Sequence, residues 1–307
     1  MEKPVIALKV DVDTYAGTRD GVPRLLDILK EAGVRATFYF SMGPDNSGKA
    51  IRRVFTRKGF LRKMLRGRAP SAFGLPTMLY GTLLPPPMIG SSFPYILKSV
   101  EHMGHEVGIH CWDHVKWHDL LPWMPKKTVA MEIGRACARF EDIFGRRTRT
   151  TAAPGWTITA DSLEIQDALF LSYSSDARGT SPFYPVLGGR RFTTLQIPTT
   201  LPVMDEILGE NGITAENIND YYLSLLSPGL NVHTIQAERE GKAMAWLFAD
   251  LIGRLKDSGA TFITLEEAAD EFGRNAPDAP LSMGEMPGVI GNVAIQGLDV
   301  PPPELFP

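Results

Sequence analysis

The sequence has few of the features that mark secreted or membrane-spanning proteins. Only two of its 307 residues are cysteines, Cys111 and Cys137, which argues against the disulfide framework of a small extracellular domain. No apolar run reaches the roughly 18 residues that a membrane-spanning helix needs. The first apolar run also lacks the preceding basic segment of a signal peptide, so we expect a cytoplasmic protein.

The composition that remains is that of a globular protein, with 44% apolar and 22% charged residues. We expect strands at 5–12, 36–42, 105–110, 148–153, 170–175, 194–200, 230–236 and 261–265, and helices at 21–32, 94–103, 128–144, 160–169, 215–226 and 242–258. This alternation predicts an α/β fold with parallel strands, and the number of units favours a distorted (β/α)7-type barrel over an open sheet. We expect residues 1–275 to form this single domain and the Pro- and Gly-rich residues 276–307 to pack on it as coil.

Positive charge is concentrated in one segment. Residues 44–95 hold nine Lys or Arg residues and one acid, Asp45, although the whole chain has a net charge of −3. Within this segment, KAIRRVFTRKGFLRKMLRGR (49–68) repeats apolar residues at three- and four-residue spacing and fills the gaps with cations. The pattern predicts an amphipathic basic helix, or two short helices broken at Gly59, inserted after the second strand.

Four interpretations of this insertion compete: nucleic-acid binding, a protein partner, an anionic membrane surface, or simple packing on the barrel. No nucleic-acid recognition motif accompanies it, and nucleic acid would leave the long uncharged stretch after residue 68 unexplained. An anionic membrane explains both the cations and the apolar stretch. We therefore expect no nucleic acid as a partner, and a membrane-facing surface that includes Arg52, Arg53, Phe55, Lys63 and Leu65.

Polar residues gather at the predicted ends of several strands. The stretch VDVDTYAGTRDG (10–21) ends a buried strand with Asp11 and Asp13, two charges that cost several kcal/mol each to bury unpaired. His110, Pro154, Asp176 and residues 233–238 follow other strands in the same way. Because active sites of parallel barrels lie at the carboxyl ends of the strands, this recurrence predicts an active site.

A pair of histidines adds metal-binding chemistry to this edge. In GIHCWDHVKWH, His110 and His114 are four residues apart, which places both imidazoles on one side of a helical turn. A lone pair of this kind is more often a pair of surface histidines. Together with a carboxylate of the DVD stretch, it predicts a facial site for one divalent cation, with zinc, cobalt, nickel, iron and manganese all suitable.

These motifs resemble those of a known enzyme family. DVD after a first strand, the HxxxH pair after a middle strand and a later strand that ends in a His-bearing motif (LNVHTIQAERE) are similar to the polysaccharide deacetylases with NodB homology (carbohydrate esterase family 4). The segments similar, in order, to the 4-deoxy-4-formamido-L-arabinose-phosphoundecaprenol deformylases, the ArnD family, are DVDTYAGTRDGVPRLLDIL, FSMGPDNSGKA, HEVGIHCWDH, AAPGWT, YSSDARG, QIPTTLPVMDEI and TIQAERE. The likeness extends over roughly residues 5–295.

The resemblance implies a peripheral enzyme on the cytoplasmic face of the inner membrane. Its expected reaction is metal-dependent removal of formyl from 4-deoxy-4-formamido-L-arabinose on undecaprenyl phosphate, a step of lipid A modification and polymyxin resistance in that family. The alternative is a deacetylase of an N-acetyl hexosamine carried on undecaprenyl phosphate. Carried over by position, Asp13, His110 and His114 are the expected metal ligands, and Asp11 is the expected general base.

Two motifs depart from the family pattern. AAPGWT has Ala152 where relatives have an Arg that orients the base, so we expect Arg178, which shares a strand face with Asp176, to replace it near Asp11. Gly155 and Trp156 are expected to supply an oxyanion donor or a wall of the site.

The second departure concerns the general acid. Relatives place a His at the position of Gln236, and an amide cannot give up a proton. Either the acid is lost and the protein is a catalytically impaired glycolipid-binding relative, or water substitutes, or a bulge brings His233 round from the opposite strand face. Glu238 is the other nearby candidate for the general acid, although we expect it to be a solvated surface acid.

Overall fold

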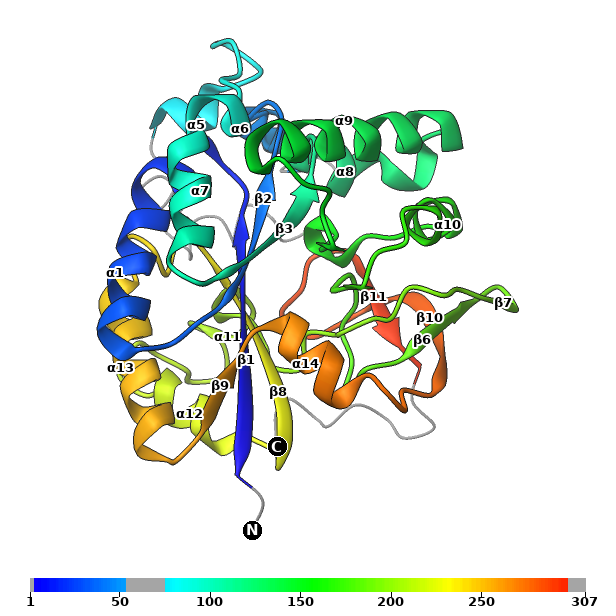
Figure 1. The fold of residues 1–307 in the computed structure, drawn as a ribbon. Helices are drawn as coiled ribbons and strands as arrows, with labels where there is room; N and C mark the ends of the chain where they lie inside the picture. The colour runs from blue at the N-terminus through cyan, green and yellow to red at the C-terminus, as the bar shows by residue number, and fades with distance from the viewer. Residues whose placement is uncertain (1–2, 54–74, 298–307) are drawn as a thin grey trace.

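The computed structural model describes residues 3–53 and 75–297, and a parallel sheet of seven strands forms its centre (Figure 1). The strands lie in the order β5-β4-β3-β2-β1-β8, and β9 pairs with the first part of β1. Their bounds are β1 (Pro4–Val12), β2 (Thr37–Ser41), β3 (Glu106–Cys111), β4 (Thr150–Thr151), β5 (Tyr173–Ser174), β8 (Gly229–Gln236) and β9 (Thr261–Ile263). The predicted α/β fold with parallel strands is confirmed.

Helices cover the outer face of this sheet (Figure 1). The longer ones are α1 (Val22–Ala32), α7 (Pro94–His102), α8 (His114–Leu120), α9 (Lys126–Phe144), α10 (Ala160–Ala168), α12 (Ile218–Ser224), α13 (Ala245–Asp257) and α14 (Leu265–Phe272). α1 begins with Pro23 in its first turn and ends at Gly33, which has a positive φ of 66°. Both are favoured at those helix ends, so the bounds of this helix follow from its sequence.

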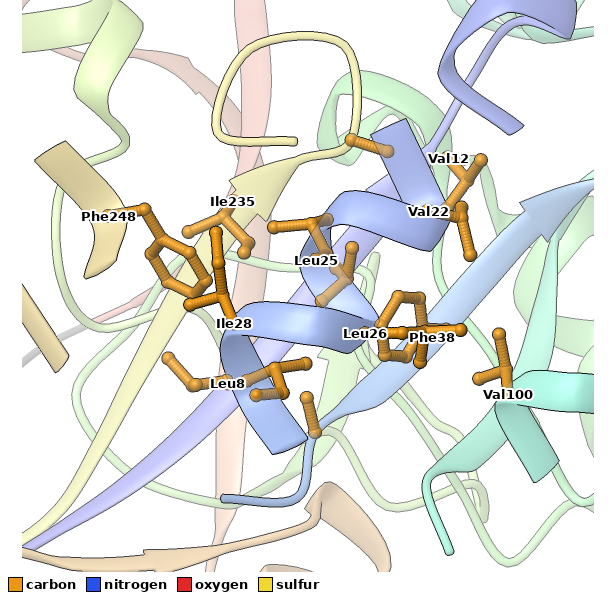
Figure 2. Close-up of a cluster of buried hydrophobic side chains, with 14 of the residues drawn as sticks. Leu8, Val12, Val22, Leu25, Leu26, Ile28, Phe38, Val100, Ile235 and Phe248 are labelled. Atoms are coloured by element: carbon orange, nitrogen blue, oxygen red, sulfur yellow. The ribbon is translucent and has the colours of Figure 1, made fainter. Parts of the chain in front are cut away.

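The central strand β1 separates an apolar face from a polar face. Leu8 and Val12 belong to the main core, and Figure 2 shows Val12 beside Val22 of α1 and Leu8 on the side of Ile28 of α1. Burial of each such side chain contributes about 1.5–3 kcal/mol. Because successive side chains of a strand point to opposite faces, Lys9 and its alternate neighbours face the barrel interior instead. The polar side chains of β1, Lys9 and Asp11, therefore face the barrel interior.

Residues 195–201 close the gap between β5 and β8 without forming a regular strand. The Ile197 amide donates to the Ser174 carbonyl (2.8 Å), and the Thr200 amide donates to the Val232 carbonyl (3.1 Å). The strand predicted at 194–200 is thus an extended segment held by isolated bridges. The strands predicted at 148–153 and 170–175 shorten to the two-residue β4 and β5.

A second sheet, in the order β11-β10-β6-β7, flanks the barrel. Its strands are β6 (Tyr184–Leu187), β7 (Arg190–Arg191), β10 (Asp278–Glu285) and β11 (Asn292–Gln296). The expectation of coil for 276–307 is therefore wrong over 278–285 and 292–296. Ala279 and Leu281 alternate into a small core with Phe183 and Phe192, a period-two pattern that the Pro and Gly content of the segment conceals.

Only the two ends of the 44–95 insertion lie in the described ranges. They contain a short 3₁₀-helix, η2 (Ser47–Arg52), and then α5 (Leu75–Leu79) and α6 (Ile89–Ser92). Most of the basic helix predicted over 49–68, including Phe55, Lys63 and Leu65, lies outside the described residues, and the side chain of Arg52 is not described either. Over the ranges that are described, no helix has the length and apolarity to cross a membrane.

Candidate active site

Three side chains from β1, β3 and α8 converge at the carboxyl end of the sheet. Asp13 Oδ1 lies 3.2 Å from His110 Nε2 and 3.5 Å from His114 Nε2. Each of the three residues offers one ligand atom, and these atoms all lie within 4.8 Å of one another. Two imidazole nitrogens and one carboxylate oxygen around a common point fit a divalent cation with open coordination positions. The predicted ligand set is thus brought together.

The N-cap of α8 fixes the position of His114, the first residue of that helix. The Asp113 carboxylate accepts a hydrogen bond from the Lys116 amide (3.0 Å), which caps α8. The other carboxylate oxygen of Asp113 accepts from Asn46 Nδ2 (2.6 Å), which ties the cap to the loop after β2. The turn from β3 into α8 therefore holds His110 and His114 on one side.

The protonation states of His114 and Asp13 suit metal binding, while, against the effect of burial, the carboxylates of Asp11 and Asp13 raise the pKa of His110. Burial lowers the pKa of His114 to about 4, so its imidazole is neutral at neutral pH and keeps a lone pair for a metal. Burial would raise the pKa of Asp13, but the facing His114 and His110 outweigh that effect and leave the pKa below its usual value. Asp13 is therefore a carboxylate, the form that ligates a cation.

A buried lysine lies beside the expected base, and the sequence analysis missed it. Lys9 is fully buried, and its Nζ donates to the Ser175 carbonyl (2.8 Å) and lies 3.8 Å from Asp11 Oδ1. Burial raises the pKa of Asp11 and lowers the pKa of Lys9, and the attraction between the two charges opposes both shifts. The signal was the spacing: Lys9 precedes Asp11 by two residues, as Asp11 precedes Asp13, so all three share the inward face of β1.

Comparison with known proteins identifies the family of this chain. The model of the polysaccharide deacetylase family matches residues 1–173. A Shewanella sediminis protein named probable 4-deoxy-4-formamido-L-arabinose-phosphoundecaprenol deformylase ArnD is 40% identical over 266 residues, 86% of each chain. A protein of the same name from Wigglesworthia glossinidia brevipalpis is 32% identical over 283 residues, 91% of this chain and 98% of its own. The chain belongs to the polysaccharide deacetylase family.

Solved polysaccharide deacetylases share the fold. The crystal structure of a Mycobacterium smegmatis protein assigned to this class superposes with a TM-score of 0.62 at 15% identity, covering 93% of this chain and 96% of that one. A peptidoglycan N-acetylglucosamine deacetylase gives a TM-score of 0.52 at 16% identity, covering 87% and 91%. At such low identity these superpositions establish a common fold and nothing more. The chemistry of this deacetylase-family chain is therefore argued from its own residues.

Arg178 pairs with a carboxylate other than Asp11. Its guanidinium donates to Glu206 Oε1 (2.5 Å) and to the Leu201 carbonyl (3.1 Å), and it lies 4.8 Å from the centre of the Trp156 ring. Among the contacts of the described chain, the cation that pairs with Asp11 is Lys9. The prediction for Arg178 is wrong because Glu206, on the first turn of α11 (Met204–Ile207), offers it a buried carboxylate.

Asp176 lies behind the site of this deacetylase-family chain. It is fully buried and accepts hydrogen bonds from Gln166 Nε2 (2.9 Å) and Gln196 Nε2 (3.2 Å). Burial raises the pKa of Asp176, while these two amides and the charge of Lys9 oppose the rise. The Asp176 carboxylate thus interacts electrostatically with Lys9 from a buried position.

Gly155 and Trp156 form a wall of the cavity, as predicted. Both have a positive φ, 56° and 49°, within the short turn η4 (Pro154–Trp156). A Cβ on Gly155 would lie only 2.1 Å from His118 Cδ2, so this position requires glycine. Trp156 is held by a hydrogen bond from its Nε1 to Thr199 Oγ1 (3.2 Å), and its amide donates to the Ala153 carbonyl.

Gln236 stands next to Asp11, and His233 does not. β1 and β8 pair in unbroken register, with Asp11 opposite Gln236 and Leu8 opposite His233. His233 therefore faces the outer core, where its ring lies 4.6 Å from that of Tyr222. No bulge turns it toward the cavity.

Glu238 is a structural clamp on the metal site, so the expectation of a solvated acid is wrong. It is buried, and its Oε1 accepts hydrogen bonds from the Asp13 amide (3.0 Å), the Thr14 amide (2.9 Å) and Thr14 Oγ1 (2.8 Å). Burial, together with the charge of Asp13, raises the pKa of Glu238 to about 8. The side chain thereby joins the segment after β8 to the end of β1.

One cavity of about 300 Å³ is lined by the site residues Asp11, Asp13, His110, His114, Gly155, Trp156 and Gln236. Its wall includes Arg53 and Met78 from the insertion and Val289 and Asn292 from the β10–β11 connection and the start of β11. It also includes side chains for which the sequence analysis proposed no role: Thr234, Asp205, Arg239 and His118. His118 could have been noticed, because it extends the four-residue spacing of the two histidines before it.

Proposed function

We propose that this protein is a metal-dependent amide hydrolase that removes formyl from 4-deoxy-4-formamido-L-arabinose carried on undecaprenyl phosphate. Two relatives that bear that deformylase name support the substrate, at 40% and 32% identity over most of this chain. The observation that carries the reaction type is the cluster of Asp13, His110 and His114 with a second carboxylate, Asp11, on the same strand face.

The roles of the residues follow from their positions. Asp13, His110 and His114 hold a divalent cation, which when bound supplies Lewis acidity to the amide oxygen and to a water. Asp11 takes a proton as that water attacks the formyl carbon. The negative charge that develops on the formyl oxygen is met by the Gly155 amide, because the Trp156 amide already donates to the Ala153 carbonyl.

Lys9 takes the part that we had expected of Arg178. Ala152 stands where family relatives have the orienting Arg, and it belongs to the same core cluster as Tyr39, whose ring lies 5.7 Å from Lys9 Nζ. From β1 the ammonium reaches across the interior to the Ser175 carbonyl, just after β5, which pairs with β4, the strand that Ala152 follows. Anchored on the Ser175 carbonyl, it orients the Asp11 carboxylate and favours its charged form.

The lipid-linked substrate implies work at an anionic membrane surface, on the cytoplasmic face. Two features of the described insertion support this. Arg53 lines the cavity and forms an ion pair with Asp119 (2.8 Å), so a cation stands at the site itself. Of the large apolar side chains exposed in the described ranges, Leu79, Leu83, Leu84 and Tyr95 cluster in residues 79–95. Arg52, Phe55, Lys63 and Leu65 remain proposed contacts on sequence grounds.

The function is tested by joining metal analysis to a formate-release assay on the lipid-linked sugar. We expect about one divalent ion per chain, loss of activity on chelation, and loss of both metal and activity in Asp13→Asn. The N-acetyl hexosamine on the same lipid serves as the competing substrate. Release of acetate from that lipid without release of formate from the first would overturn the deformylase assignment and leave the hydrolase.

A further inference from the structure

A third histidine lines the cavity outside the metal cluster. His118 follows His114 by one helical turn of α8, and the centres of the two rings are 6.1 Å apart. The cluster of close ligand atoms in the described chain consists of Asp13, His110 and His114 and does not include it. His118 nevertheless borders the same cavity as Asp11 and Gln236.

The surroundings of His118 orient its ring. Its Nδ1 lies 3.2 Å from Asp119 Oδ1, and the Asp119 carboxylate is itself held by Arg53 Nε at 2.8 Å. A carboxylate at one ring nitrogen holds the proton there and stabilises the imidazolium. The opposite nitrogen, Nε2, lies on the side of Gly155, where an added Cβ would stand only 2.4 Å away from it. Nε2 therefore faces the turn to which we assign the oxyanion donor.

Amide hydrolysis requires a proton when the C–N bond breaks, because an amine cannot leave as an anion. Gln236 has no proton to give, and His233 lies on the other face of β8. His110 and His114 point their nitrogens at Asp13. Of the imidazoles that border the cavity in the described chain, His118 is the one not committed to the metal.

We propose that His118 is the general acid of this enzyme, an inference that rests on the proposed hydrolase function. As the C–N bond breaks, its electron pair passes to nitrogen, and the proton on His118 Nε2 forms the new N–H bond. The water proton remains on Asp11 at that point. Loss of this proton and reprotonation of the imidazole from solvent restore both groups, so the overall reaction is amide plus water to amine plus formate and a proton. The general acid of this chain is thus on α8, and not at the end of β8 where relatives have it.

The test compares leaving groups. A nitrophenolate leaves without a proton, so His118→Gln in the metal-loaded protein should leave nitrophenyl acetate hydrolysis within about twofold while formate release from the lipid-linked sugar falls by about 10²- to 10⁴-fold. Adding Gln236→His to that variant should recover at least tenfold, because it returns an acid to the cavity. His102→Gln, an exposed histidine on α7, is the matched control and should change neither rate.

Each other outcome has a definite meaning. Unchanged formate release in His118→Gln would overturn the inference and assign the proton to Asp11. Equal loss on both substrates, or loss of bound metal, would also overturn it by showing that His118 supports the site structurally. If the unmodified protein releases no formate but hydrolyses the ester, the proposed substrate fails, and the comparison of leaving groups then decides the role of His118 on any amide that the protein cleaves.

Discussion

The sharpest prediction concerns Lys9, since a buried cation beside a catalytic base should be worth several kcal/mol. Lys9→Met keeps most of the volume and removes the charge. Two unit charges 3.8 Å apart interact by about 4 kcal/mol at an effective dielectric constant of about 20. If that attraction is used to hold Asp11 ready for proton transfer, its loss slows the reaction by up to about 10³-fold.

We expect kcat for formate release to fall by about 10²- to 10³-fold in Lys9→Met, with KM and metal content unchanged, because Lys9 is not one of the three clustered ligands and is not among the residues that line the cavity in the described chain. Lys9→Arg keeps the charge and should retain most of the activity. A second control moves the charge: Ala152→Arg in the Lys9→Met background places a guanidinium where relatives have theirs, and should recover part of kcat.

The measurement is steady-state kinetics on the three variants with metal analysis and thermal unfolding in parallel. Wild-type kcat in Lys9→Met would refute the argument directly. So would a Lys9→Arg variant that is folded, metal-loaded and as slow as Lys9→Met, because the charge alone would then not account for the role of Lys9.

Three further predictions follow from the same region. Glu238→Ala frees the backbone at Asp13 and should weaken metal binding about 10- to 100-fold in a competition titration; unaltered affinity would refute the clamp. Burial raises the pKa of Glu240 to about 7 from 4.5, so the neutral acid stabilises the fold at low pH and roughly 3 kcal/mol is lost as pH rises from about 4 to about 8. Glu240→Gln should therefore raise the urea midpoint at about pH 8 and leave it unchanged at about pH 4. Leu83→Glu should reduce flotation with anionic liposomes, and Phe170→Glu, equally exposed but outside the insertion, should not; equal flotation of the two variants would exclude Leu83 from the membrane contact.

Local signals predicted most of the fold. α1 was found within one residue at its start because Pro23 and Gly33 mark its ends, and β1 and β8 because their apolar runs are long. The strands that close the barrel were overestimated, since β4 and β5 are only two residues long and the segment at 194–200 pairs through isolated bridges. Barrel closure depends on neighbours far away in sequence, which no local pattern contains.

Within the site, predictions that used spacing succeeded and those that chose partners failed. The imidazoles of His110 and His114 meet Asp13 as predicted, although His110 lies in β3 and not on the helical turn that the spacing implied. Arg178 was matched to Asp11 by analogy with a missing guanidinium, yet its partner is Glu206, 28 residues away. Glu238 was judged exposed from its polarity, although its carboxylate is buried against Thr14.

The sequence by itself determined which side chains share a face: Lys9, Asp11 and Asp13 along the inward row that continues β1, and His114 and His118 on α8. Periodicity fixes that, because it depends only on backbone geometry. Only the tertiary structure decided what stands opposite each face. The register of β8 sets Gln236 beside Asp11, and the turn at Gly155 makes room for His118, because both depend on distances between segments that the chain brings together only when it folds.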